Sequence, residues 1–147
     1  MRGKSNVQVL RTGAVEAVAS HIESKEDYIF QPALEARIVR FVTEYAKSLH
    51  ALGVEPPIAV MISLLRARGM HIASDRPVSG MIVEDIPSQM IDRDQLHFVE
   101  TVFTAIPLHQ NIVGQGMRAT LDHLANAAGL SASSGFDSLD VYVNRDY

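Results

Sequence analysis

The sequence contains no cysteine among its 147 residues. This absence excludes a disulfide-stabilised scaffold, thiolate metal ligands, a cysteine nucleophile and redox switching through thiols. A chain of this length can bury one hydrophobic core, so it needs neither a metal nor a disulfide to fold. We therefore expect a single domain over residues 1–147, and the lack of cysteine fits the cytoplasm.

The sequence also lacks a basic excess and a long hydrophobic run. Its formal net charge is −4, whereas a sequence-independent phosphate binder carries a clear excess of Lys and Arg, so we expect no direct nucleic-acid binding by this segment. The N-terminus has no apolar core of the kind found in signal peptides. The longest apolar run, residues 58–65, is far too short to span a bilayer. We expect a soluble cytoplasmic protein that does not associate with a membrane.

Residues 32–52 predict a long amphipathic helix around which the rest of the chain is organised. Pro32 suits the first helical turn, and Gly53 suits the left-handed position just past the end. The apolar residues recur at alternating intervals of three and four, which places them on one stripe of a helix. That stripe consists of Leu34, Ile38, Phe41, Tyr45, Leu49 and Leu52. Such a helix must pack against an apolar partner.

The remaining segments predict several strands and a second helix. The run at 58–65 does not alternate, so we expect a strand covered on both faces. Gly129 ends a second helix with apolar residues at helical spacing, and the small polar tail after it is expected to be flexible. The expected elements are a hairpin at 7–20, the helix at 32–52, strands at 58–65, 70–73 and 95–105, a helix at about 111–128 and a tail at 131–147. This order predicts an α+β fold, a mostly antiparallel sheet with two amphipathic helices packed on one face.

Two aspartates and two histidines are the strongest candidates for chemistry. Asp92 and Asp94 flank Arg93 and could share a divalent cation, while His71 and His97 could meet on adjacent strands. The spacing implies no third ligand, so the simpler interpretation is a solvated loop and two separate histidines. We therefore assign no catalytic, cofactor-binding or metal residue, and we keep His71, Asp92, Asp94 and His97 as an alternative metal site.

Other motifs are weaker. Gly114-Gln115-Gly116 precedes a predicted helix, but no strand leads directly into it, as a nucleotide-binding fingerprint requires. The serines form no G-x-S-x-G elbow, so serine hydrolase chemistry has no support. Arg66 and Arg68 could contact a phosphate or an acidic partner, although such arginines are more typical of a solvated hairpin tip.

Five segments occur in an order that is typical of one protein family. They are Gly13–Val18, Leu52–Leu65, Arg68–Gly69, Ile91–Leu96 and Leu124–Gly129. Together they resemble the C-terminal region of bacterial DNA-binding transcriptional regulators that carry a Schlafen-type AlbA head. The combination of Gly-Val-Glu-Pro-Pro-Ile with Ile-Asp-Arg-Asp is the most specific part. We expect this chain to correspond to that C-terminal region without the head, and the resemblance implies a regulatory or assembly module with no transferable catalytic residue.

The leading hypothesis from the sequence is a non-enzymatic regulatory or assembly module that self-associates as a homodimer, because isologous pairing is the commonest assembly of a small domain. A regulatory protein partner is a further expectation, and no cofactor is expected. One alternative is a metal-dependent hydrolase acting on nucleic acid or a nucleotide. Another is a small-molecule sensor with a pocket between the helices and the sheet.

Overall fold

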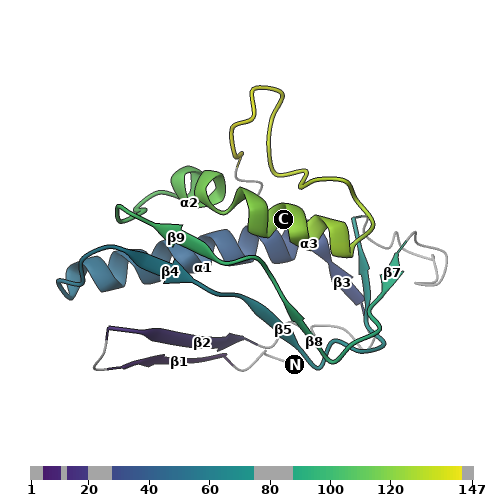
Figure 1. Cartoon of the computed structure of the whole chain (residues 1–147), viewed down its shortest axis with the longest axis horizontal. Helices are drawn as coiled ribbons and strands as arrows, with labels where there is room; N and C mark the ends of the chain where they lie inside the picture. Colours follow the sequence, from purple (N-terminus) through teal and green to yellow (C-terminus); the bar gives the residue numbers. More distant parts are fainter. Residues whose placement is uncertain (1–4, 11–12, 20–27, 75–87, 144–147) are drawn as a thin grey trace.

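The computed structural model describes residues 5–10, 13–19, 28–74 and 88–143. Helices and mostly antiparallel strand pairs confirm the predicted α+β class (Figure 1). No helix in these ranges is long and apolar enough to cross a membrane. In chain order the elements are β1 (Ser5–Val9), β2 (Val15–Ala19), β3 (Tyr28–Phe30), α1 (Gln31–Ala51), β4 (Ile58–Val60), β5 (Ser63–Leu65), β6 (His71–Ala73), β7 (Gln89–Met90), β8 (Gln95–His97), β9 (Thr101–Phe103), α2 (Gln110–Gly116) and α3 (Arg118–Ala127).

The helix α1 begins and ends within one residue of the predicted bounds. Pro32 lies in its first turn, where a missing N–H leaves no hydrogen bond unmade. Gly53 follows the last turn with a φ of +76°, a backbone conformation that favours glycine. The next N–H, of Val54, donates to the carbonyl of Leu49 at 3.0 Å, which closes the helix end.

The buried face of α1 is broader than the predicted stripe and rotated away from it. Leu34 and Leu49 are buried as expected, whereas Leu52 is 65% exposed. Polar side chains are buried instead, and Thr43 satisfies its hydroxyl by donating to the carbonyl of Val39 at 2.8 Å. Apolar periodicity alone does not predict this face, because the face also includes buried polar side chains that form hydrogen bonds. Its members are Gln31, Pro32, Leu34, Glu35, Val39, Thr43, Ala46 and Leu49.

Strands β4, β5, β8 and β9 form one long antiparallel ribbon that lies across α1 (Figure 1). Val60 pairs with Thr101, and Ser63 pairs with His97. Two residues on the first strand therefore oppose three on the second, which is a β-bulge. The bulge divides each of the predicted strands 58–65 and 95–105 into two parts.

The prediction that residues 58–65 are covered on both faces is wrong. Along this strand half-buried and exposed side chains alternate, with Ile58, Val60, Ile62 and Leu64 turned toward the core. The opposite side chains face outward, and Met61 is 72% exposed. The run lacks polar alternation although only one of its faces is packed within the chain.

A second sheet has the order β3–β6–β7. The pair β3–β6 is parallel, with Ile29 opposite Ile72, and β7 joins β6 antiparallel. Both isoleucines are almost completely buried, and Leu124 of α3 belongs to the same core cluster. This parallel pair departs from the otherwise antiparallel pattern because α1 and the first ribbon strand separate β3 from β6 along the chain.

The predicted helix at 111–128 is two helices, α2 and α3, joined at Met117. The two glycines of α2 sit where side chains from other elements approach closely. A Cβ on Gly116 would overlap the ring of Phe103, and one on Gly114 would overlap the ring of Tyr142. These close approaches explain why two poor helix formers stand in a helix. Around them a second core cluster collects Val39, Phe103, Val113, Met117, Leu121 and Tyr142.

Candidate functional site

Each of the four residues of the alternative metal site contacts a residue outside that set. His71 Nδ1 lies 3.0 Å from the hydroxyl of Ser88, and His97 Nδ1 lies 2.8 Å from the hydroxyl of Ser63 on the opposite ribbon strand. Among the described residues, no three His, Asp or Glu side chains gather closely enough to bind a metal ion together. The structure therefore does not assemble this set into one site.

The two aspartates of that set form ion pairs with arginines at the end of the ribbon. Asp94 accepts from Arg68 at 3.1 Å, and Asp92 accepts from Arg93 at 3.1 Å. The hydrogen bond and the charge of Arg93 lower the pKa of Asp92. All four side chains are largely exposed, so these pairs are screened by water and contribute little to stability.

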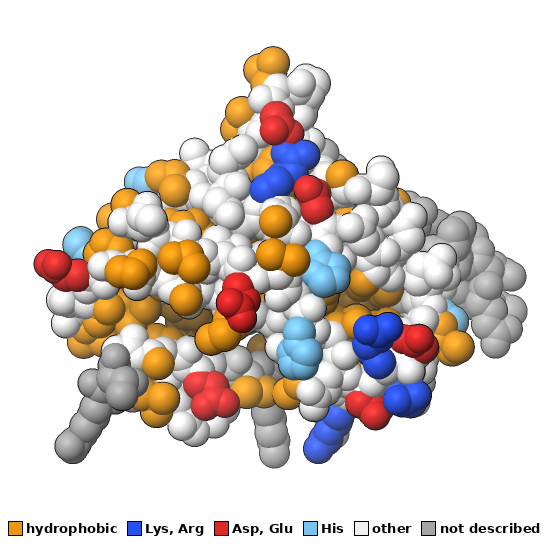
Figure 2. Space-filling view, viewed as in Figure 1, with side chains coloured by type: hydrophobic (Ala, Val, Ile, Leu, Met, Phe, Trp, Pro, Cys, Tyr) orange, Lys and Arg blue, Asp and Glu red, His pale blue; other side chains and the backbone are white. Residues whose placement is uncertain are grey.

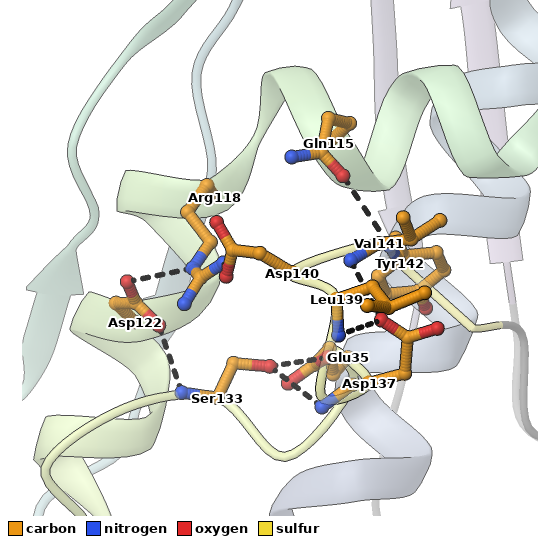
Figure 3. A network of polar contacts seen from close by, with 11 residues as sticks. Glu35, Gln115, Arg118, Asp122, Ser133, Asp137, Leu139, Asp140, Val141 and Tyr142 are labelled. Atoms are coloured by element: carbon orange, nitrogen blue, oxygen red, sulfur yellow. Dashed lines mark hydrogen bonds and ion pairs between the residues drawn. The ribbon is translucent and has the colours of Figure 1, made fainter.

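Residues 131–143 form a C-terminal strap that folds back over α1, α2 and α3 (Figures 1 and 3). Ser133 anchors it at a buried position. Its hydroxyl donates to Glu35 of α1 at 2.7 Å, and its N–H donates to Asp122 of α3 at 2.8 Å. Gln31 donates to the other Glu35 oxygen at 2.7 Å. Burying a carboxylate is costly unless it is hydrogen-bonded, and these contacts meet that requirement.

Arg118 forms a second anchor of the strap (Figure 3). Its guanidinium contacts Asp122 of its own helix and Asp140 of the strap. The same group lies 3.9 Å from the ring centre of Phe136, within the range of a cation–π interaction. The hydrogen bond to Asp140 raises the pKa of Arg118 further above its usual range. The strap is thus held by charge as well as by packing.

The distal part of the strap is shaped by local hydrogen bonds. The Asp137 carboxylate accepts from the N–H groups of Leu139 and Val141, both at 2.9 Å. Tyr142 then returns to the core and is only 4% exposed. Within the predicted flexible tail, Ser133, Gly135 and Tyr142 are thus buried, whereas residues 137–141 are exposed and project away from the helices (Figure 1). Residues 144–147 lie outside the described residues.

Two hollows flank the strap. The crevice beside Glu35, which Pro32, Ser134 and Tyr142 also line, has room for about one water molecule. An open, apolar hollow lies between α2 and the strap and is lined by Phe103, Asn111, Ile112, Gln115, Gly116 and Val141. The first is too small for a metabolite. The second has a volume of about 570 Å³, within the range of ligand pockets, but it is open to solvent rather than enclosed.

The outer face of the ribbon carries exposed apolar side chains. Val102 is 60% exposed and Leu65 is 58% exposed, and Val99 and Met61 lie on the same outer side of the bulge region. Figure 2 shows hydrophobic side chains over α2 and the adjoining end of the ribbon. Basic and acidic side chains lie together at the opposite end and on the strap, and single acidic side chains lie elsewhere on this face. The charged end contains the Arg68–Asp94 and Arg93–Asp92 pairs.

The β1–β2 hairpin has little cover from the rest of the described chain. Val7 pairs with Ala17 and Val9 pairs with Val15, so these four apolar side chains share one face of the hairpin. Only Val15 is half-buried, whereas Val7 is 47% exposed and Val9 is 56% exposed. On the other face Val18 is 54% exposed. The hairpin therefore carries a row of exposed apolar side chains on one face.

Sequence reasoning did not identify these bare apolar positions as a site. The missing polar alternation in residues 58–65 was the available signal, since a strand packed on one face only should alternate. No protein-family model, curated protein or solved structure matches this chain. The fold and its surfaces therefore carry the functional argument.

Proposed function

We propose that this protein is an assembly module that self-associates and has a regulatory rather than a catalytic role. The observation that carries the proposal is apolar surface left bare on strands, on the outer face of the ribbon and on the β1–β2 hairpin. Exposed apolar area of this kind marks interaction surfaces more often than chance. We take the partner to be a second copy of the chain, because isologous pairing is the commonest assembly of a small domain.

The hairpin gives the proposal a thermodynamic basis. A two-stranded hairpin is marginally stable in water at best, and a third strand or a packed face is needed to stabilise it. The side chains of β1 from Asn6 to Val9 are all exposed, so packing within the chain contributes little there. An intermolecular contact would provide the missing burial, at about 25 cal/mol for each Å² of apolar surface.

The sequence resemblance adds the expectation that the assembled module serves a DNA-binding regulator. Homodimers suit that role because two linked heads bind paired half-sites. No observation among the described residues favours the metal-dependent hydrolase, since the candidate ligands have other partners. The hollow between α2 and the strap is open rather than enclosed, so we do not propose the small-molecule sensor.

Sedimentation equilibrium across the micromolar range tests the proposal. We expect a mass of twice the 16.1 kDa of one chain, with dissociation only at the lowest concentrations. The melting temperature should rise with protein concentration, because folding is then linked to association. A monomer at every concentration, with a melting temperature independent of concentration, would refute self-association.

A further inference from the structure

Among the described residues, no strand pairs with the outer edge of β1. β1 lies on the outer side of the hairpin, and β2 lies between it and the ribbon (Figure 1). Its sequence, Ser-Asn-Val-Gln-Val, contains no Pro, Lys or other charged residue. Monomeric proteins usually block such an edge with charge, proline, a bulge or a covering segment. β1 contains no charged residue and no proline, and its pairing with β2 has no bulge.

The hydrogen-bonding pattern between β1 and β2 determines which backbone groups of β1 point toward its outer edge. Leu10 donates to Ala14 at 2.8 Å just beyond the strands, so this pair is hydrogen-bonded. Antiparallel pairs alternate between hydrogen-bonded and non-bonded, so Gln8–Glu16 is bonded and Val7–Ala17 is not. The N–H and C=O groups of Ser5, Val7 and Val9 therefore point away from β2.

We propose that two copies of this chain join by antiparallel pairing of their β1 strands about a two-fold axis at Val7. This inference rests on the proposed self-association and assigns its contact. Val7 of each copy exchanges both backbone hydrogen bonds with Val7 of the other, and Ser5 pairs with Val9 on either side. The two hairpins become one four-stranded sheet, and each copy uses the same surface, as an isologous contact requires.

The register follows from the side chains. Directly opposite residues share a face, so pairing Val7 with Val7 merges the apolar rows of Val7, Val9 and Ala17 from both copies. A shift that placed Val7 opposite Gln8 would mix the apolar and polar faces. The ribbon face is a weaker choice for the contact, because the inner side chains of the ribbon already pack on the core and stabilise it. The hairpin lacks such packing.

A proline substitution tests the edge directly. In Val7→Pro the lost N–H is one that β2 does not use, so the hairpin remains paired while the free edge is blocked. The loss of the reciprocal hydrogen bonds at the axis should raise the dimer dissociation constant by roughly 30- to 100-fold. Ala17→Pro is the matched control, because its N–H points to the opposite edge of the hairpin, and it should leave the dimer intact.

The absence of cysteine allows a second test that does not depend on proline being tolerated. Val7→Cys should form an intermolecular disulfide on mild oxidation, because residues exchanging both bonds have Cα atoms about 5.5 Å apart. In Gln8→Cys the two thiols would be diagonal neighbours about 7–8 Å apart, which is too far. Ala17→Cys would cross-link only if β2 rather than β1 formed the contact.

The outcomes separate this contact from self-association itself. A dimer that cross-links through Val7→Cys and is lost in Val7→Pro supports the β1 contact. A dimer that persists in Val7→Pro without cross-linking through Val7→Cys, or that is lost instead in Val102→Lys on the ribbon face, overturns the β1 contact and leaves self-association standing. A wild-type protein that is always monomeric overturns both.

Discussion

Replacing Gly114 with alanine should destabilise the protein even though alanine is the better helix former. Gly114 is buried in α2, and the ring of Tyr142 packs directly against its Cα. A Cβ at this position would lie 2.6 Å from Cδ2 of the ring and closer still to other ring atoms. The ring must therefore leave its site, because the helix backbone cannot move away without disturbing the core.

The magnitude follows from two opposing terms. Losing the packing of a buried aromatic side chain costs about 3–5 kcal/mol, and the gain in helix propensity from glycine to alanine offsets about 1 kcal/mol of this. The expected net loss is about 2–4 kcal/mol. For a chain of this length that corresponds to a melting temperature lower by roughly 4–16 °C. Thermal and urea unfolding followed by circular dichroism measure both quantities.

The Tyr142→Ala variant supplies the control. Once the ring is absent, Gly114→Ala should become stabilising by up to about 1 kcal/mol, because only the propensity term remains. The substitution thus reverses its sign between the two backgrounds, which a double-mutant cycle measures as a coupling energy. If Gly114→Ala is neutral in the wild type, or has the same sign in both backgrounds, the strap does not pack on α2 as described.

Two further predictions concern the polar contacts. Ser133→Ala removes a buried hydroxyl that donates to Glu35 and should lower the free energy of unfolding by about 1–3 kcal/mol. The control is Ser134→Ala at the exposed neighbouring position, which should change the free energy of unfolding little. Equal effects of the two substitutions would contradict the strap contact. Asp92→Asn should reduce stability slightly at neutral pH, because the pair with Arg93 is exposed and screened, and have no effect at strongly acid pH. The pKa of Asp92 is lowered in the folded state by Arg93, so its contribution is present above the unfolded pKa and is lost as pH falls through the folded pKa. A difference between Asp92→Asn and wild type that stays constant from neutral to acid pH, measured by urea unfolding, would contradict this.

The α+β class and the position of the long helix were accessible from local patterns. Pro32 and Gly53 mark backbone conformations that only certain residues adopt, and these constraints act on a few neighbouring residues. The same patterns could not show that Glu35 and Thr43 are buried. Glu35 is covered by Ser133, which lies 98 positions away in sequence. Thr43 satisfies its hydroxyl within α1, at the carbonyl of Val39, and its burial depends on the packing of α1 against other elements.

Two predicted elements are each divided into two in the structure, and in both cases contacts with residues distant in sequence cause the division. Residues 95–105 have uniform strand character, and the bulge arises only because the opposite strand has one residue fewer between paired positions. The helix expected at 111–128 breaks at Met117, where the glycines of α2 fit against Phe103 and Tyr142. In both cases a non-local partner decides the geometry.

By itself, the sequence determined the chemical limits of this protein and its local elements: no cysteine, no excess of basic residues, an amphipathic helix and β-rich segments. These properties depend on residue type and on spacing within a few positions. Only the tertiary structure decided that the candidate metal ligands lie apart, that the strap closes over α1, and that β1 and the ribbon leave apolar side chains bare. Those outcomes depend on contacts between distant residues, such as Glu35 and Ser133, which are 98 positions apart, because burial is a property of the whole packed chain rather than of any one segment.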